Sequence, residues 1–70
     1  MNSAELMMKD FITELAILLR DAKRKADLGD PFDLGRKMGL YEALSLLKDQ
    51  ATAFGISFES LTDVDPDKLI

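Results

Sequence analysis

Apolar residues recur every three to four positions along two long stretches of this chain, and the run Gly29-Asp30-Pro31 separates the stretches. That spacing gathers apolar side chains on one side of an α-helix. Gly29 suits the left-handed position that ends a helix, and Asp30 followed by Pro31 is a strong helix start. The sequence therefore predicts an all-α chain, an antiparallel helical hairpin with helices over about 3–28 and 31–54.

Capping residues define the outer ends of the two predicted helices. Asn2, with Glu5 three residues later, predicts the start of the first helix, and Gly55 predicts the end of the second. Gly35 and Gly39 lie inside the second helix and cost it about 1 kcal/mol each relative to alanine. Whether the first turns of that helix are fully helical is left open by the pattern.

The helical spacing of apolar residues stops after Gly55. Ser57 and the pair Asp65-Pro66 are each suited to begin a short turn. We expect residues 55–70 to form a mostly irregular C-terminal tail that lies across the helices, within a single domain covering 1–70. The sequence does not indicate how this tail packs.

Each predicted helix carries two apolar seams, which together cover about half of its circumference, whereas a surface helix that faces one core has a stripe of about 100°. A hairpin gives each helix only one neighbour, and leaving large apolar side chains exposed forgoes about 1.5 to 3 kcal/mol each. We therefore expect two hairpins to pair as a homodimeric four-helix bundle. The residues expected in the core and dimer seam are Met8, Phe11, Ile12, Leu15, Leu18, Leu19, Leu40, Leu44, Leu47 and Phe54.

Small and polar residues interrupt these seams at particular places. In an antiparallel hairpin that turns at Gly29, small residues of the two helices fall opposite one another near the turn. Close helix contact is therefore expected at Ala22, Ala26, Gly35, Gly39 and Ala43. Arg36 and Gln50 are candidates for setting the register of the dimer, because polar residues in helical seams fix alignment at a cost in stability. An exposed position at the rim is the equally weighted alternative for both.

The residue inventory argues against catalysis and metal binding. The chain has no cysteine and no histidine, so the usual zinc ligands are missing, and no nucleophile stands beside a base. Asp63, Asp65 and Asp67 have the spacing that opens a calcium loop, but the sixth position is Lys68 where that loop requires glycine. We therefore expect no enzymatic activity, no cofactor and no metal site.

The charge distribution bears on the partners. The net charge of −4 disfavours nucleic acid, yet six of the nine basic residues cluster around the predicted turn. This cluster consists of Arg20, Lys23, Arg24, Lys25, Arg36 and Lys37. Its position keeps open a second hypothesis, a nucleic-acid-associated regulator that uses the basic turn end.

The leading functional hypothesis is a small homo-oligomeric interaction module, accessory or regulatory, that pairs with itself and docks on a larger protein. Charged residues interrupt every apolar stretch before it could span a bilayer, so we expect a cytoplasmic protein without a membrane partner. Sequence alone does not separate a like partner from an unlike one, a dimer from a higher oligomer, or one biological role from another.

Overall fold

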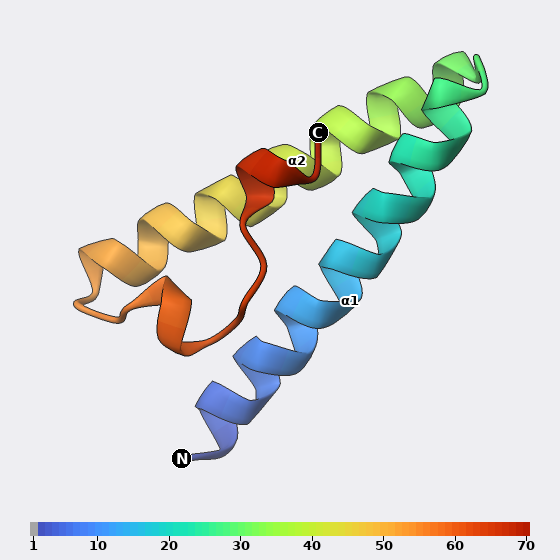
Figure 1. Cartoon of the computed structure of the whole chain (residues 1–70). Helices are drawn as coiled ribbons and strands as arrows, with labels where there is room; N and C mark the ends of the chain where they lie inside the picture. The colour runs from blue at the N-terminus through green and yellow to red at the C-terminus, as the bar shows by residue number, and fades with distance from the viewer. Residues whose placement is uncertain (1) are drawn as a thin grey trace.

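The computed structural model describes residues 2–70 as an elongated body measuring 40 × 19 × 16 Å. Two antiparallel helices, α1 (Ser3–Asp27) and α2 (Pro31–Ala53), make up most of it (Figure 1). Two 3₁₀ turns, η1 (Phe58–Ser60) and η2 (Pro66–Lys68), follow. There is no strand in the described part of the chain, so the predicted all-α helical hairpin is confirmed.

Both helices begin at the capping residues that the sequence indicates. The Asn2 side-chain oxygen accepts a hydrogen bond of 2.8 Å from the backbone N–H of Glu5. The Asp30 carboxylate accepts from the backbone N–H groups of Phe32 and Asp33 at 2.9 and 3.5 Å. Because α2 is helical from Pro31 onward, its two internal glycines do not interrupt it.

Each helix ends in a left-handed glycine that reverses the chain. Gly29 and Gly55 have φ angles of 100° and 74°, a region in which a side chain is strained. After α2, the backbone N–H of Ile56 donates to the carbonyl of Ala51 at 2.8 Å and that of Gly55 to the carbonyl of Thr52 at 3.0 Å, which together form a Schellman motif. The chain therefore leaves α2 in a fixed direction, back along the hairpin.

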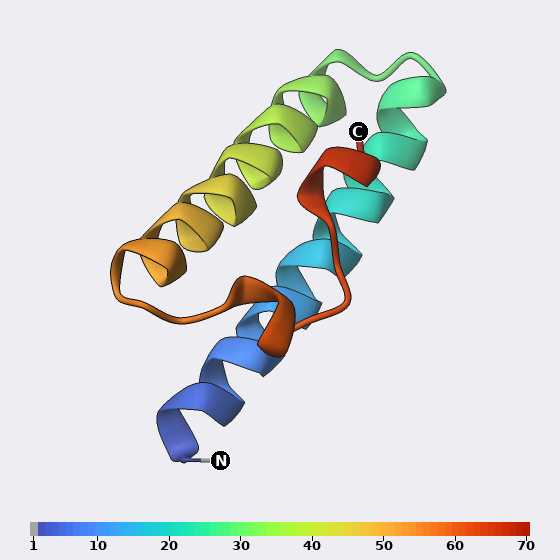
Figure 2. The same cartoon turned by 60° about the vertical axis from the view of Figure 1, so that its left-hand side comes forward.

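The tail, residues 55–70, runs from the end of α2 back toward the turn between the helices, in front of the pair in both views (Figures 1 and 2). Its Phe58 and Leu61 are buried and join Ile12, Leu19 and Leu44 of the two helices in one hydrophobic core. A second set of half-buried residues packs around this core: Met8, Leu15, Leu40, Tyr41, Leu47, Ile56, Val64 and Leu69. The tail is therefore the third wall of the core.

This arrangement changes the argument for a partner chain. The two apolar seams predict another molecule as the second neighbour of each helix, whereas Phe58 and Leu61 of the same chain supply that neighbour on one side of the hairpin. The four-helix bundle is not part of the fold of one chain. What a partner could still cover is the side of the hairpin that the tail leaves bare.

The rotation of α2 differs from the predicted one. A Cβ atom built on Gly35 or Gly39 would have no heavy atom within 4 Å, so the glycines do not approach α1 within one chain. Leu44, fully buried, fixes the side of α2 that faces the core, and the glycines lie well around the helix from it. Among the residues expected at the close contact, Ala22 is buried and Ala26 half-buried, whereas Gly35, Gly39 and Ala43 are exposed.

In the described residues, no helix combines the length and the apolar character that a membrane crossing requires.

Candidate interaction surface

The tail covers one side of the hairpin, and its contacts identify that side on each helix. On α1, Lys23 and Asp27 line a hollow together with Leu69 of the tail. On α2, Ser45 lines another hollow together with Pro66. We refer to this side of the hairpin as the tail side.

The opposite side of the hairpin is not covered by the tail and carries several exposed apolar residues among charged and polar ones. Successive residues of a helix are about 100° apart, which places Leu18 about 140° around α1 from Lys23, and Ala43 about 160° around α2 from Ser45. The buried Leu19 and Leu44 lie between these extremes on their helices. Because the buried sides face each other, the bare sides of both helices fall on the same face, opposite the tail. This open face carries Met7, Phe11 and Leu18 of α1, and Phe32, Gly39, Ala43, Leu46 and Phe54 of α2.

The large side chains of the open face are strongly exposed. Phe32 is 75% exposed, Phe54 77% and Leu46 60%. The open-face residues of α2 form a strip along that helix. Gly39 and Ala43 are small, so the surface in the middle of this strip lies below its two ends, where Phe32 and Phe54 are large. Exposed apolar residues that gather on one face and are surrounded by polar ones are typical of interaction sites.

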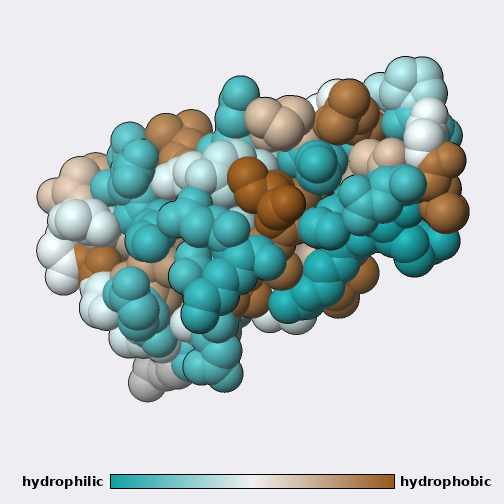
Figure 3. Space-filling model, turned by 45° about the horizontal axis from the view of Figure 1, so that its top comes forward, coloured by the Kyte–Doolittle hydropathy of each residue, from teal (hydrophilic) through white to brown (hydrophobic). Residues whose placement is uncertain are grey.

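Figure 3 shows the hydropathy of the surface that is visible when the top of Figure 1 is turned forward. Hydrophilic side chains cover most of it, and hydrophobic side chains gather there in separate clusters, one near the centre.

The ten residues expected in the core and dimer seam separate into three groups. Ile12, Leu19 and Leu44 are fully buried within the single chain, and Met8, Leu15, Leu40 and Leu47 are half-buried around them. Phe11, Leu18 and Phe54 are exposed on the open face. The helical spacing of apolar residues therefore predicted core residues and exposed surface residues together, without separating them.

Arg36 links the two helices beside the open face. Its Nη1 donates to Asp21 of α1 at 3.1 Å and to Asp33 of α2 at 3.0 Å. Asp33 is only 4% exposed, so the guanidinium pairs a carboxylate that is largely removed from water. Both carboxylates that pair with Arg36 belong to its own chain. Gln50 is exposed.

Asp21 is shared by three cations. Arg36, Arg24 and Lys25 approach its carboxylate at 3.1, 2.9 and 3.3 Å. The hydrogen bonds from Arg36, and then those from Arg24 and Lys25, lower the pKa of Asp21 from 3.8 to about 2. The ionised form is thus favoured in the folded chain.

We expect this ion-pair cluster to make stability fall in acid. The pKa of Asp21 is lower in the folded chain than in the unfolded one, so its contribution is present above about pH 4. It is lost as the pH falls toward 2, the pKa of Asp21 in the folded chain.

Thermal melts between pH 7 and 2 should show Asp21→Asn to be less stable than wild type at pH 7, with a smaller loss of stability between pH 4 and 2. Asp10→Asn, at an exposed position without an ion pair to any residue in 2–70, should follow wild type. Equal losses in wild type and Asp21→Asn would contradict the assignment.

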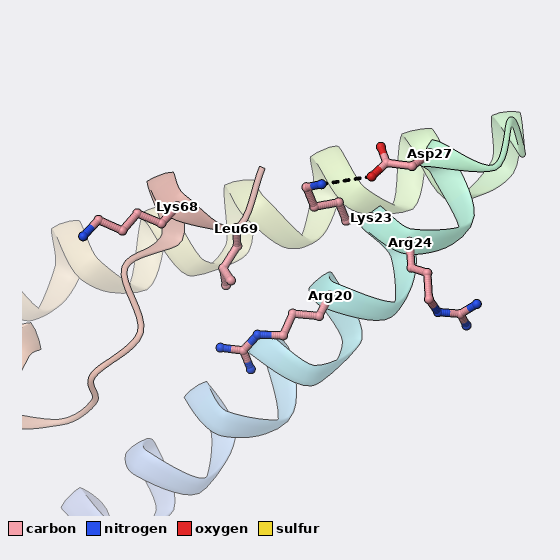
Figure 4. A pocket seen from close by; sticks show the side chains of 6 residues that line it. All are labelled: Arg20, Lys23, Arg24, Asp27, Lys68 and Leu69. Atoms are coloured by element: carbon pink, nitrogen blue, oxygen red, sulfur yellow. Dashed lines mark hydrogen bonds and ion pairs between the residues drawn. The ribbon is translucent and has the colours of Figure 1, made fainter.

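The basic cluster at the turn end is largely paired with aspartates. Lys23 contacts Asp27 at 2.9 Å and lowers the pKa of that carboxyl. Arg20, Lys23, Arg24 and Lys68 do line a shallow hollow beside the tail (Figure 4). Their charged ends point in different directions, however: Lys68 extends away from the others and Arg24 away from the tail. This geometry does not converge on a bound anion.

A link between tail and hairpin was missed in the sequence. The Tyr41 hydroxyl of α2 donates a hydrogen bond of 2.6 Å to Asp67, which raises the pKa of Tyr41. Asp65, another member of the acidic series, caps η2 by accepting from the backbone N–H of Asp67. Only the helix-capping role of Asp65 was visible in the sequence, because nothing in the pattern relates Tyr41 to a residue in the tail. Within the described residues, no cluster of acidic side chains is suited to hold a metal ion.

Comparisons with protein-family models, curated proteins and solved structures find no match to this chain. The open face and the charged and polar residues beside it are therefore the features from which we infer a function.

Proposed function

We propose that this chain is a homodimeric protein–protein interaction module that pairs through the open face into a four-helix bundle. Its role is accessory or regulatory, without catalytic activity of its own, and its other surfaces serve to dock on a larger protein. The observation that carries the proposal is the exposure of Phe11, Leu18 and Phe32 with Leu46 on one face, while the tail covers the other.

The size of the open face is adequate for a stable pair. A typical specific interface buries about 800 Å² on each partner, which is about a sixth of the 4673 Å² that the single chain exposes. One long side of a rod with these dimensions offers an area of that order. Full burial of each large side chain contributes about 1.5 to 3 kcal/mol, and several together offset an association cost of about 4 to 15 kcal/mol.

The nucleic-acid hypothesis has weaker support. Its basis is the hollow lined by Arg20, Lys23, Arg24 and Lys68, but Lys23 and Arg24 each have an aspartate partner at 2.9 Å. Cations already paired within the chain contribute less to a phosphate backbone.

The proposal is tested by a pair of neighbouring substitutions. Leu18 lies on the open face and is 43% exposed, whereas Ile17 is 51% exposed but lies about 100° away around α1. In size-exclusion chromatography with light scattering at micromolar concentration, wild type should have the mass of two chains. Leu18→Glu should have the mass of one chain, because each copy would then place a carboxylate in the apolar interface.

Ile17→Glu is the matched control and should keep the mass of two chains. Circular dichroism should show that both variants retain the helical content of wild type. A folded wild-type monomer at micromolar concentration contradicts the proposal. Equal dissociation of the two variants places the contact elsewhere on the surface.

A further inference from the structure

We infer that two copies pair with α2 antiparallel to α2 across a two-fold axis that passes beside Ala43. This inference rests on the proposed dimer and adds its register. It follows from a symmetry in the exposed residues of one helix. Aromatic and polar residues occur at matching distances before and after Ala43.

The aromatic residues define the two ends of the symmetric strip. Phe32 lies eleven residues before Ala43 and Phe54 eleven residues after it. Eleven residues are about three helical turns, so all three positions lie on nearly the same side of α2. In an antiparallel pair centred on Ala43, Phe32 of each copy meets Phe54 of the other. The two most exposed aromatic side chains in the described residues then cover each other at both ends.

The polar residues match in the same register. Arg36 lies seven residues before Ala43 and Gln50 seven after it, so each guanidinium meets the amide of the other copy. Arg36 uses Nη1 for both of its carboxylate contacts. A guanidinium has five N–H donors, and the Gln50 amide oxygen is a suitable acceptor for one that these contacts do not use. A polar pair inside an apolar helical interface is a device that fixes register.

Near the centre of the pair, a small residue of one copy faces a large residue of the other. Leu46, three residues after the axis, falls within one residue of the level of Gly39 on the other copy, and both lie on the same edge of the strip. The space beside Gly39 is open in the single chain and admits the exposed Leu46 side chain. At Ala43 itself the two helices approach closely, because only methyl groups separate them. Leu18 and Phe11 of α1 flank this contact and face the partner copy.

Disulfide trapping tests the register directly, because the chain contains no cysteine of its own. Ala43→Cys places two thiols beside the axis, within the Cα separation of about 4.4 to 6.8 Å that a disulfide requires. With oxidised glutathione at micromolar protein, it should form a covalent dimer about a hundredfold faster than Glu42→Cys. The reason is that apposed thiols reach millimolar effective concentration. Residue 42 is also exposed but is turned about 100° away.

A second pair of variants tests the direction of the helices. Phe32→Cys and Phe54→Cys should each form little covalent dimer alone, but their mixture should give the 32–54 disulfide, identified by mass spectrometry. A 32–32 disulfide would indicate parallel helices and overturn the inference.

The two proposals fail in distinguishable ways. Wild type with the mass of one chain rejects the dimer itself. Wild type with the mass of two chains, together with equal oxidation rates for Ala43→Cys and Glu42→Cys, rejects the register and leaves the dimer in place.

Discussion

Replacing Leu44 with alanine is expected to lower the free energy of unfolding by about 2 to 5 kcal/mol. Leu44 is fully buried and packs in the cluster where α1, α2 and the tail meet. Truncation leaves a cavity bounded by all three, and two of its walls are long helices that cannot collapse into it without losing other contacts. Urea unfolding followed by circular dichroism, at one fixed protein concentration, measures the loss.

Leu6→Ala is the control for this substitution. Leu6 is also a leucine on a helix, but it is exposed and lies outside both the core and the open face. Alanine is at least as good a helix former as leucine, so the midpoint should change little. A Leu44→Ala midpoint as close to wild type as that of Leu6→Ala would show that the core is not where the structure places it.

The second large effect concerns the tail, and Phe58→Ala is expected to cost about 3 to 5 kcal/mol. Phe58 is 3% exposed and follows the reversal at Gly55, so it holds the returning segment in the groove between the helices. The loss should appear in urea unfolding and as faster proteolytic cleavage of residues 55–70. Small domains have about 5 to 15 kcal/mol in total, so this single ring supplies a large share.

Ile70→Ala provides the comparison within the tail. Ile70 is apolar and lies in the same segment, but 46% of it is exposed, so its truncation should have a much smaller effect. If Phe58→Ala released the tail to proteases without lowering the stability of the helices, the tail would be an attachment and not a wall of the core.

The helices could be predicted because local chemistry determines where they begin and end. Asn2 and Asp30 supply side-chain acceptors for unpaired N–H groups, and Gly29 and Gly55 adopt the left-handed conformation after each helix. These signals act within a few residues and do not depend on the rest of the fold. Both helices consequently lie within one residue of the predicted bounds.

The packing of the tail and the rotation of α2 could not be predicted, because they depend on contacts between distant residues. Phe58 and Leu61 enter the core from a segment without helical periodicity, so the spacing of apolar residues did not predict that they would be buried there. The two seams of α2 looked equivalent in sequence. What separates them is the docking of the tail and the contact of Arg36 with Asp21, fifteen residues away.

The sidedness of the hairpin limits how far such chains can assemble. The tail covers core residues on one side of the hairpin, and the proposed dimer uses the open face on the other. If the open faces of two copies pair about a two-fold axis, each copy buries the same surface, and this contact cannot add a third copy. The returning segment, anchored by Phe58 and Tyr41, keeps the core residues beneath it away from other molecules. Loss of that segment would therefore convert a closed pair into an open-ended aggregate.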